Sequence, residues 1–207
     1  MKKLLHLVAT PREEDSRTLK VSKAFLETFL AKHKDFVWEE IRLIEEKLPS
    51  LSLKRVDGKY VLLQGKNLHG ELKKTWEEIL FQIDRFLSSG VIVISTPMWN
   101  FNIPYMLKHY IDIIVQPRLL FRYREDGSVE GLAKNKKMVV ITSRGGDYTS
   151  DKSLDFQEPY LRGIFGFVGI TDITFINAQP TDMGEEKERE ALQEAIEKAK
   201  QLGLMDA

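Results

Sequence analysis

Three short segments carry residues whose types and spacing could hold a flat ligand with a charged tail. The first is TPMWNFNIP, residues 96–104, which follows directly on the apolar run VIVIS at 91–95. A loop that only turns the chain favours Gly, Asn, Asp, Ser and Pro, because these residues supply unusual dihedral angles or local hydrogen bonds. This loop instead presents soft and flat side chains, which suit the face of a planar apolar ligand. They belong to Pro97, Met98, Trp99, Asn100 and Phe101.

The second segment follows the first apolar run and could bind a phosphate group. Thr10 ends that run, and Ser16, Arg17 and Thr18 open the next helical stretch. A helix N-terminus presents free backbone N–H groups at the positive end of the helix dipole, and it therefore binds anions. Ser16 taken alone is equally well an ordinary N-cap, and Arg17 a solvated charge. The position after the first strand favours the phosphate site.

The third segment is SRGGDY, residues 143–148, which contains Ser143, Arg144 and Tyr148. Gly145 and Gly146 lack side chains, so a ligand could approach the backbone closely there. A tight turn would explain the same two glycines. Together the three segments offer a phosphate site, a wall of aromatic and thioether groups, and a glycine wall. Flavin mononucleotide (FMN) has the matching parts, namely a phosphate, a ribityl chain and a flat ring.

These segments can meet if a parallel sheet brings them to one edge. Apolar runs typical of strands alternate with amphipathic helical stretches, which is the pattern of an α/β protein with helices on both faces of a sheet. Right-handed crossovers then favour a flavodoxin-like three-layer sandwich with a five-stranded parallel sheet of order 2-1-3-4-5 and a ligand beyond the carboxyl ends of the strands. The expected strands are 4–9, 36–44, 91–95, 138–143 and 173–178, and the expected helices are 16–32, 67–89, 105–115 and 185–202.

Two further stretches carry hairpin signals. Asp57-Gly58 lies in the ambiguous stretch 45–64, and Asp126-Gly127 lies between the third and fourth strands. Both dipeptides suit the tight turn of a β-hairpin.

Length, charge and composition narrow the function classes. A chain of 207 residues with no repeat or linker is expected to form a single domain, 1–207. Its 31 basic and 31 acidic residues cancel, so we expect no nucleic-acid partner and no membrane association. The absence of Cys excludes disulfides and thiolate chemistry, and the four His are scattered without metal-ligand spacing, so no metal site is expected. No apolar stretch approaches the roughly 20 residues of a membrane span, and the protein is expected to be cytoplasmic.

Several motifs together resemble one known family. PMWNFNIP, LKHYID, FRYREDG, ITSRGG and YLRGIFGFVGITD are similar to segments of the FMN-dependent NADH:quinone oxidoreductases, also called azoreductases. The likeness covers most of residues 1–20 and 90–180, whereas residues 45–75 match poorly. Trp99 stands where the family commonly has Tyr, and Tyr148 stands where it often has His.

The resemblance implies a flavodoxin-like homodimer that binds FMN. Thr10, Ser16, Arg17 and Thr18 would hold the phosphate and ribityl chain, and the 97–101 and 143–146 segments, with Tyr148, would surround the ring. NADH or NADPH would donate electrons to a quinone or azo acceptor in a two-step ping-pong cycle. Trp99, Phe121, Tyr123 and Phe165 would contact flat substrates, some of them across the subunit interface, although Phe165 suits a plain core position equally well.

Two alternatives belong to other classes of protein. One is a non-catalytic electron carrier of the flavodoxin type, which a neutral net charge disfavours because such carriers are usually acidic. The other is an interaction domain that has the fold without the cofactor, since fold alone does not establish function.

Overall fold

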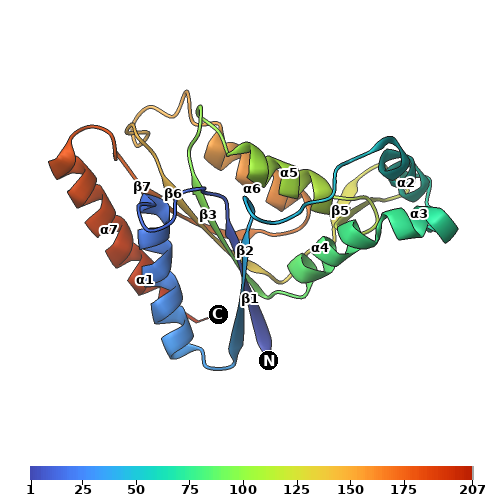
Figure 1. Ribbon diagram of the computed structural model, residues 1–207, viewed down its shortest axis with the longest axis horizontal. Helices are drawn as coiled ribbons and strands as arrows, with labels where there is room; N and C mark the ends of the chain where they lie inside the picture. Colours follow the sequence, from blue (N-terminus) through green and yellow to red (C-terminus); the bar gives the residue numbers. More distant parts are fainter. Residues whose placement is uncertain (207) are drawn as a thin grey trace.

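The computed structural model describes residues 1–206 and is built around one twisted parallel sheet (Figure 1). Its strands lie in the order β2-β1-β3-β6-β7. Because the short strands β4 and β5 form a separate hairpin, this order equals 2-1-3-4-5 for the five strands of the main sheet, and the predicted topology is confirmed. The five strands are β1 (Lys2–Val8), β2 (Phe36–Arg42), β3 (Val91–Pro97), β6 (Lys137–Ser143) and β7 (Asp172–Ala178).

Helices cover both faces of the sheet (Figure 1). Helices α1 (Arg17–Lys32) and α7 (Glu185–Gly203) lie on one face. The other face is covered by α4 (Glu77–Leu87), α5 (Tyr105–Ile114) and α6 (Gln157–Phe167). Successive side chains of a strand point to opposite faces, so Leu4 joins the core under α1 while Leu5 joins the core under α5. This burial on both faces explains why the strand sequences are apolar without alternation.

The hairpin expected at Asp57-Gly58 is wrong, because these residues lie inside helix α2 (Leu53–Leu63). Gly58 allows the Trp76 side chain to pack closely against helix α2. A Cβ atom at Gly58 would lie only 2.2 Å from Nε1 of Trp76, so the missing side chain lets the Trp76 indole rest on the helix backbone. The same Nε1 donates a hydrogen bond to the carbonyl oxygen of Arg55 at 3.1 Å.

The helix expected at 67–89 is divided at Trp76 into α3 (Gly70–Thr75) and α4. Figure 1 shows α2 and α3 together at one end of the molecule, beyond the edge of the sheet. The hairpin expected at Asp126-Gly127 is confirmed as β4 (Phe121–Tyr123) and β5 (Val129–Gly131), and Gly127 has the positive φ of 81° that such a turn requires. In residues 1–206, no helix is both long and apolar enough to cross a bilayer.

A hydrogen-bonded series of polar side chains, the buried polar chain, lies between the sheet and helix α1. His6 on β1 has Nδ1 3.1 Å from Oε2 of Glu40 on β2 and Nε2 2.7 Å from Oγ of Ser95 on β3. Ser95 in turn contacts the hydroxyl of Ser22 at 2.5 Å, and Ser22 donates to the carbonyl oxygen of Thr18 at 2.9 Å. These contacts link the second strand to the first turn of α1. Burial lowers the pKa of His6, and the hydrogen bond to Glu40 opposes that shift.

Candidate functional site

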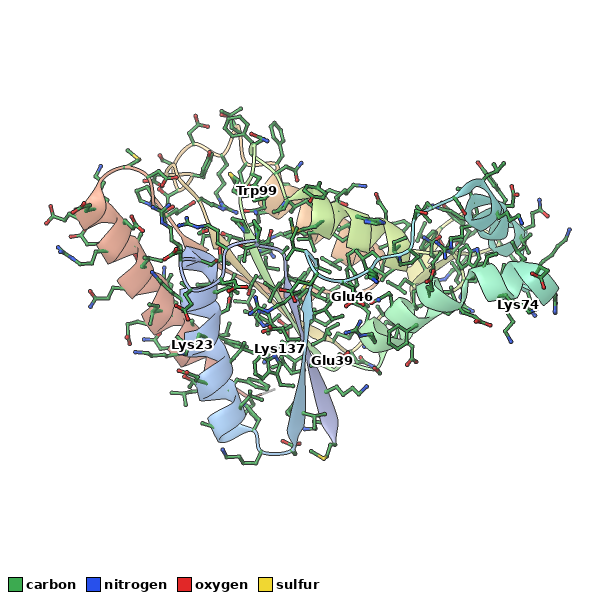
Figure 2. All side chains as sticks on the ribbon, viewed as in Figure 1. Lys23, Glu39, Glu46, Lys74, Trp99 and Lys137 are labelled. Carbon is green, nitrogen blue, oxygen red and sulfur yellow. The ribbon has the colours of Figure 1, made fainter. Side chains whose placement is uncertain are left out.

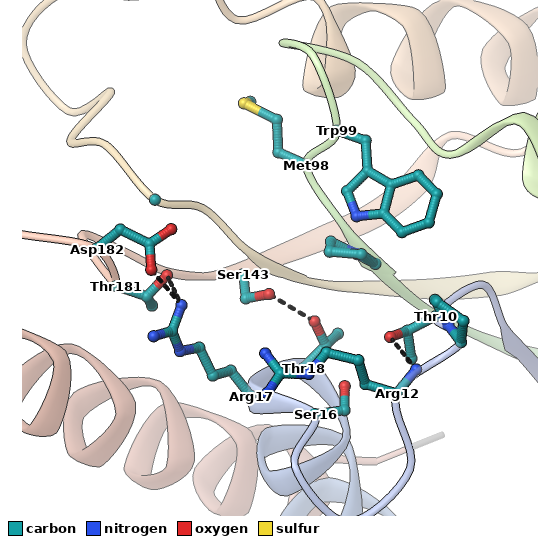
Figure 3. Close-up of a pocket in the computed structure, with 13 residues that line it drawn as sticks. Thr10, Arg12, Ser16, Arg17, Thr18, Met98, Trp99, Ser143, Thr181 and Asp182 are labelled. Carbon is teal, nitrogen blue, oxygen red and sulfur yellow. Dashed lines mark hydrogen bonds and ion pairs between the residues drawn. The ribbon is translucent and has the colours of Figure 1, made fainter.

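A cavity of about 220 Å³ lies beyond the carboxyl ends of the parallel strands. Four loops build it, because β1, β3, β6 and β7 all end at this edge of the sheet. Trp99 marks this edge in Figure 2, and Figure 3 shows the cavity in close-up. Its lining residues are Thr10, Pro11, Arg12, Ser16, Arg17, Thr18, Pro97, Met98, Trp99, Ser143, Gly145, Thr181 and Asp182.

The first turn of helix α1 forms one side of the cavity. Ser16 is the N-cap, and its hydroxyl accepts a hydrogen bond from the backbone N–H of Leu19 at 3.3 Å. Helix geometry leaves the first backbone N–H groups without acceptors inside the helix, so this turn presents hydrogen-bond donors at the positive end of the dipole. The hydroxyl of Thr18 lies 2.7 Å from that of Ser143 on β6, which fixes the turn against the sheet. An anionic group fits this position.

Arg17 provides the cation on this side, and two carboxylates hold it. Its Nε and Nη2 donate to the two carboxylate oxygens of Glu188 at 2.6 and 3.0 Å. Its Nη1 donates to Oδ1 of Asp182 at 2.5 Å and to Oγ1 of Thr181 at 3.3 Å (Figure 3). The hydrogen bond with Glu188 raises the pKa of Arg17 above its already high ordinary value, so the guanidinium stays charged. Arg17 and Asp182 both line the cavity, so an anion that approached Nη1 of Arg17 would meet the Asp182 carboxylate there.

The loop after β3 forms the opposite side of the cavity, which Met98 and Trp99 line. In Figure 3 the Trp99 indole points toward the side of Thr10 and the α1 turn, whereas the Met98 side chain extends away from that turn. Trp99 and Asn102 exchange two backbone hydrogen bonds, of 2.8 and 2.9 Å. The two residues between them, Asn100 and Phe101, consequently have φ values of 47° and 67°. Asn adopts this left-handed region readily, but a bulky aromatic residue rarely does. The tight turn leaves the Trp99 side chain 36% exposed and Phe101 43% exposed.

Gly145 allows the loop after β7 to close on the loop after β6. A Cβ atom at Gly145 would lie 2.6 Å from Oδ2 of Asp182, and the backbone N–H of Asp182 donates to the carbonyl oxygen of Gly145 at 3.1 Å. A larger residue at this position would first displace the exposed carboxylate of Asp182.

Several residues expected to bind the cofactor do not line this cavity in the described chain. Asn100 and Phe101 lie in the turn beyond Trp99. Arg144 points away from the cavity, because its guanidinium is buried against Asp155 at 2.9 Å. Tyr148 is also outside the cavity lining. Its ring lies 5.9 Å from the Arg144 guanidinium and beside Gly146.

The residues expected to contact substrates are dispersed. Trp99 lines the cavity. Phe121 and Tyr123 lie in the β4–β5 hairpin, where Phe121 is buried against Phe167 with ring centroids 4.7 Å apart. Phe165 is completely buried and stacks on Phe86 at 6.1 Å, so it is a core residue of this chain and is closed to a substrate.

Four lining residues were not expected from the sequence, namely Pro11, Arg12, Thr181 and Asp182. A signal for the last two was available, because the fifth expected strand ends at Ala178 and the loops after parallel strands meet at one edge. Arg12 lies in the loop after the first strand, where its backbone N–H donates to Oγ1 of Thr10 at 3.3 Å.

A parallel sheet of this order, with an anion-binding helix terminus at its carboxyl edge, defines a protein of the flavodoxin-like class. A sequence model described as a flavodoxin-like fold matches residues 2–202. The chain is 35% identical over 208 residues to an FMN-dependent NADH:quinone oxidoreductase of Nitratidesulfovibrio vulgaris, covering 99% of each chain. It is 35% identical to the protein of the same name from Desulfotalea psychrophila, covering 98% of each.

Solved structures give the same result. A Bacillus anthracis FMN-dependent NADH-azoreductase in complex with FMN superposes with a TM-score of 0.84 at 32% identity, covering 98% of this chain and 100% of that one. A further azoreductase structure from Bacillus anthracis has a TM-score of 0.88 at 26% identity, covering 98% of this chain and 99% of that one. The chain therefore belongs to the family of FMN-dependent NADH:quinone oxidoreductases, and the resemblance seen in the sequence is confirmed.

Proposed function

We propose that this protein is an FMN-dependent oxidoreductase that transfers two electrons from NADH or NADPH to quinones and aromatic azo compounds. The names of its relatives, FMN-dependent NADH:quinone oxidoreductase and azoreductase, support this activity. The observation that carries the proposal is the meeting of a helix terminus, a Met-Trp wall and a glycine loop at one cavity.

The residues present fit FMN. The N–H groups and hydroxyls of the first α1 turn, together with Arg17, suit the phosphate. Small-molecule pockets usually span roughly 300–1,000 Å³, so a cavity of about 220 Å³ suits the polar tail of a ligand whose flat ring lies along the exposed loop. Met98 and Trp99 are the soft and flat side chains on that side. When bound, FMN supplies the redox chemistry by accepting a hydride and passing on two electrons.

The protein would then bind FMN, orient the electron donor and acceptor against it, and exclude competing reactions. No acid–base residue would be required. The Trp99 side chain offers a partly exposed flat surface against which an aromatic acceptor can stack. We propose that donor and acceptor occupy this same surface in turn, which gives a ping-pong cycle. Steady-state kinetics with varied donor and acceptor should give parallel double-reciprocal lines. Intersecting lines would contradict the alternation.

We also propose that the chain forms a homodimer. The 97–105 segment exposes Trp99, Phe101 and Tyr105. Phe156, also exposed, is joined to this segment by a backbone hydrogen bond of 3.0 Å to Phe101. Exposed apolar groups gathered at one place mark interaction surfaces. Sedimentation velocity should give about twice the chain mass of 24.0 kDa, and a single-chain mass at micromolar concentration would refute the dimer.

One experiment separates this function from an electron carrier and from a cofactor-free domain. The protein is purified without added flavin, its visible spectrum is recorded, and FMN is then titrated. We expect bound flavin, and NADH- or NADPH-driven reduction of a quinone. A colourless protein that takes up no FMN would refute the oxidoreductase and the carrier together, whereas flavin binding without quinone reduction would favour the carrier.

A further inference from the structure

A second cavity, of about 310 Å³, lies against strand β7. It shares the loop after β6 with the first cavity but uses alternate residues of it. Ser143 and Gly145 line the first cavity, whereas Arg144 and Tyr148 line the second. No residue lines both cavities in the part of the chain that the structure describes, so the two cavities are distinct.

The buried guanidinium of Arg144 is the first sign of a binding site. Arg144 is 1% exposed, and its Nη1 and Nε donate to Asp155 at 2.9 Å and to Gln157 at 3.2 Å. Within residues 1–206, its Nη2 has no hydrogen-bond partner. Oε2 of Glu158 is 3.9 Å away, which exceeds hydrogen-bond distance. A buried charged donor without an acceptor is costly, so this position calls for an acceptor from a ligand.

A second buried polar atom without a partner lines the same cavity. It is Oε1 of Gln179. Only four buried side-chain polar atoms lack a partner in the described chain, and two of these four belong to residues of this one cavity. Buried polar groups are nearly always hydrogen-bonded. Nη2 of Arg144 needs an acceptor, which a carboxylate supplies, and Oε1 of Gln179 needs a donor, which a ring hydroxyl or amino group of the same ligand would supply.

The remaining lining defines the shape and charge of that ligand. Tyr148 and Phe175 provide flat aromatic surfaces. The two carboxylates of the lining have cations of their own, because Glu158 pairs with Arg162 at 2.8 Å and Glu194 pairs with Lys198 at 2.6 Å. Lys152 adds a further positive charge. Arg144 is itself paired with Asp155 at 2.9 Å, so the positive excess of the cavity comes from Lys152 alone. This excess suits a flat ligand with one negative charge.

We propose that this second cavity binds a small aromatic carboxylate, with the carboxylate accepting from Nη2 of Arg144 and the ring lying against Tyr148 and Phe175. A guanidinium pairs well with a planar carboxylate. The site is independent of the proposed oxidoreductase activity.

The test is a ¹⁹F NMR titration of the protein with 4-fluorobenzoate, carried out with and without saturating FMN. We expect saturable binding of equal strength in both cases. The uncharged isostere 4-fluorobenzamide can still accept from Nη2 through its carbonyl oxygen, but it lacks the negative charge. It should bind several-fold more weakly, because hydrogen bonds between ionised groups are stronger than those to a neutral acceptor. Tyr148→Ala and Lys152→Gln should each weaken binding several-fold. Lys23→Gln, which removes an exposed charge on α1, should leave it unchanged.

Arg144→Lys should abolish binding, and its thermal unfolding shows whether the variant remains folded. Should it fail to fold, the Tyr148 and Lys152 variants still decide the question. Absence of saturable binding, equal binding of the amide, or displacement of 4-fluorobenzoate by FMN would each overturn the proposal. The titration without FMN tests the second cavity even if the protein takes up no flavin, so failure of this proposal can be told apart from failure of the proposed function.

Discussion

Neutralising Asp182 should strengthen FMN binding. Asp182 lines the first cavity and accepts from Nη1 of Arg17 at 2.5 Å, so it occupies the donor that a phosphate would use. Glu188 holds the same guanidinium through its two other nitrogens at 2.6 and 3.0 Å. The substitution Asp182→Asn would remove the competing charge while Glu188 keeps Arg17 in place.

The size of the effect follows from the geometry. An acceptor that reaches the same nitrogen would lie roughly 4–5 Å from the Asp182 carboxylate, where two unit charges interact by about 1 kcal/mol in water. A phosphate monoester carries about −1.5 to −2 charges at neutral pH, so the repulsion is about 1.5–2 kcal/mol before screening. The Asp182 side chain is 64% exposed, which reduces the expected gain to about 3–10-fold in Kd.

FMN fluorescence quenching measures this Kd at low and at high salt. The advantage of Asp182→Asn should shrink as salt rises, because screening weakens the repulsion. Glu188→Gln should act in the opposite direction and weaken FMN binding, since Arg17 loses its two-point support. Glu186→Gln is the matched control, because it removes an exposed carboxylate from the same end of α7 without touching the cavity.

A Kd for Asp182→Asn that equals or exceeds that of the unmodified protein at low salt would refute the reasoning. It would mean that Asp182 orients Arg17 for the phosphate and does not compete with it.

Three further predictions concern the acceptor surface, the packing and the pH dependence. Trp99→Ala should retain FMN but lower kcat/KM for flat acceptors by about 2–10-fold, since aromatic stacking contributes about 0.5–1.5 kcal/mol, and unchanged kinetics for every acceptor would remove Trp99 from the pocket. Gly131→Ala should lower the free energy of unfolding in urea by about 3 kcal/mol or more, because its Cβ would lie 2.2 Å from the backbone nitrogen of Gly169. Gly163→Ala, with open space in helix α6, should instead stabilise by up to about 1 kcal/mol. Because burial lowers the pKa of His6 below 6.5, the unfolded chain takes up a proton first, so stability should fall as pH drops from 6.5 toward about 4.5, where carboxylates begin to titrate. His6→Gln should remove part of that slope, and an identical slope in both proteins would contradict the assignment.

The topology and much of the first cavity could be predicted because they follow from general properties of parallel sheets. Apolar runs without alternation predict strands covered on both faces, and right-handed crossovers then place the loops of β1, β3 and β6 together. Thr10, Ser16, Met98 and Gly145 were found in this way, and all four line the cavity.

The rest depends on side-chain directions and long-range packing, which a single sequence does not reveal. Gly58 follows Asp57 as in a hairpin turn, yet it contacts Trp76, which lies between helices α3 and α4. Arg144 stands between two residues that line the cavity, but its guanidinium is drawn away by Asp155, eleven positions further along the chain.

The buried polar chain under helix α1 has an uneven supply of hydrogen atoms. An ionised Glu40 only accepts, so Nδ1 of His6 must donate to it, and in the neutral imidazole Nε2 then takes the single proton of Ser95. Ser22 is left with one proton for two acceptors, Ser95 and the carbonyl oxygen of Thr18. One added proton on the imidazole would satisfy every link, because Nε2 would donate to Ser95, Ser95 would turn to donate to Ser22, and Ser22 would keep donating to Thr18. The protonation state of His6, on the first strand, is thereby coupled to the hydroxyl dipoles beneath the helix turn that faces the cavity.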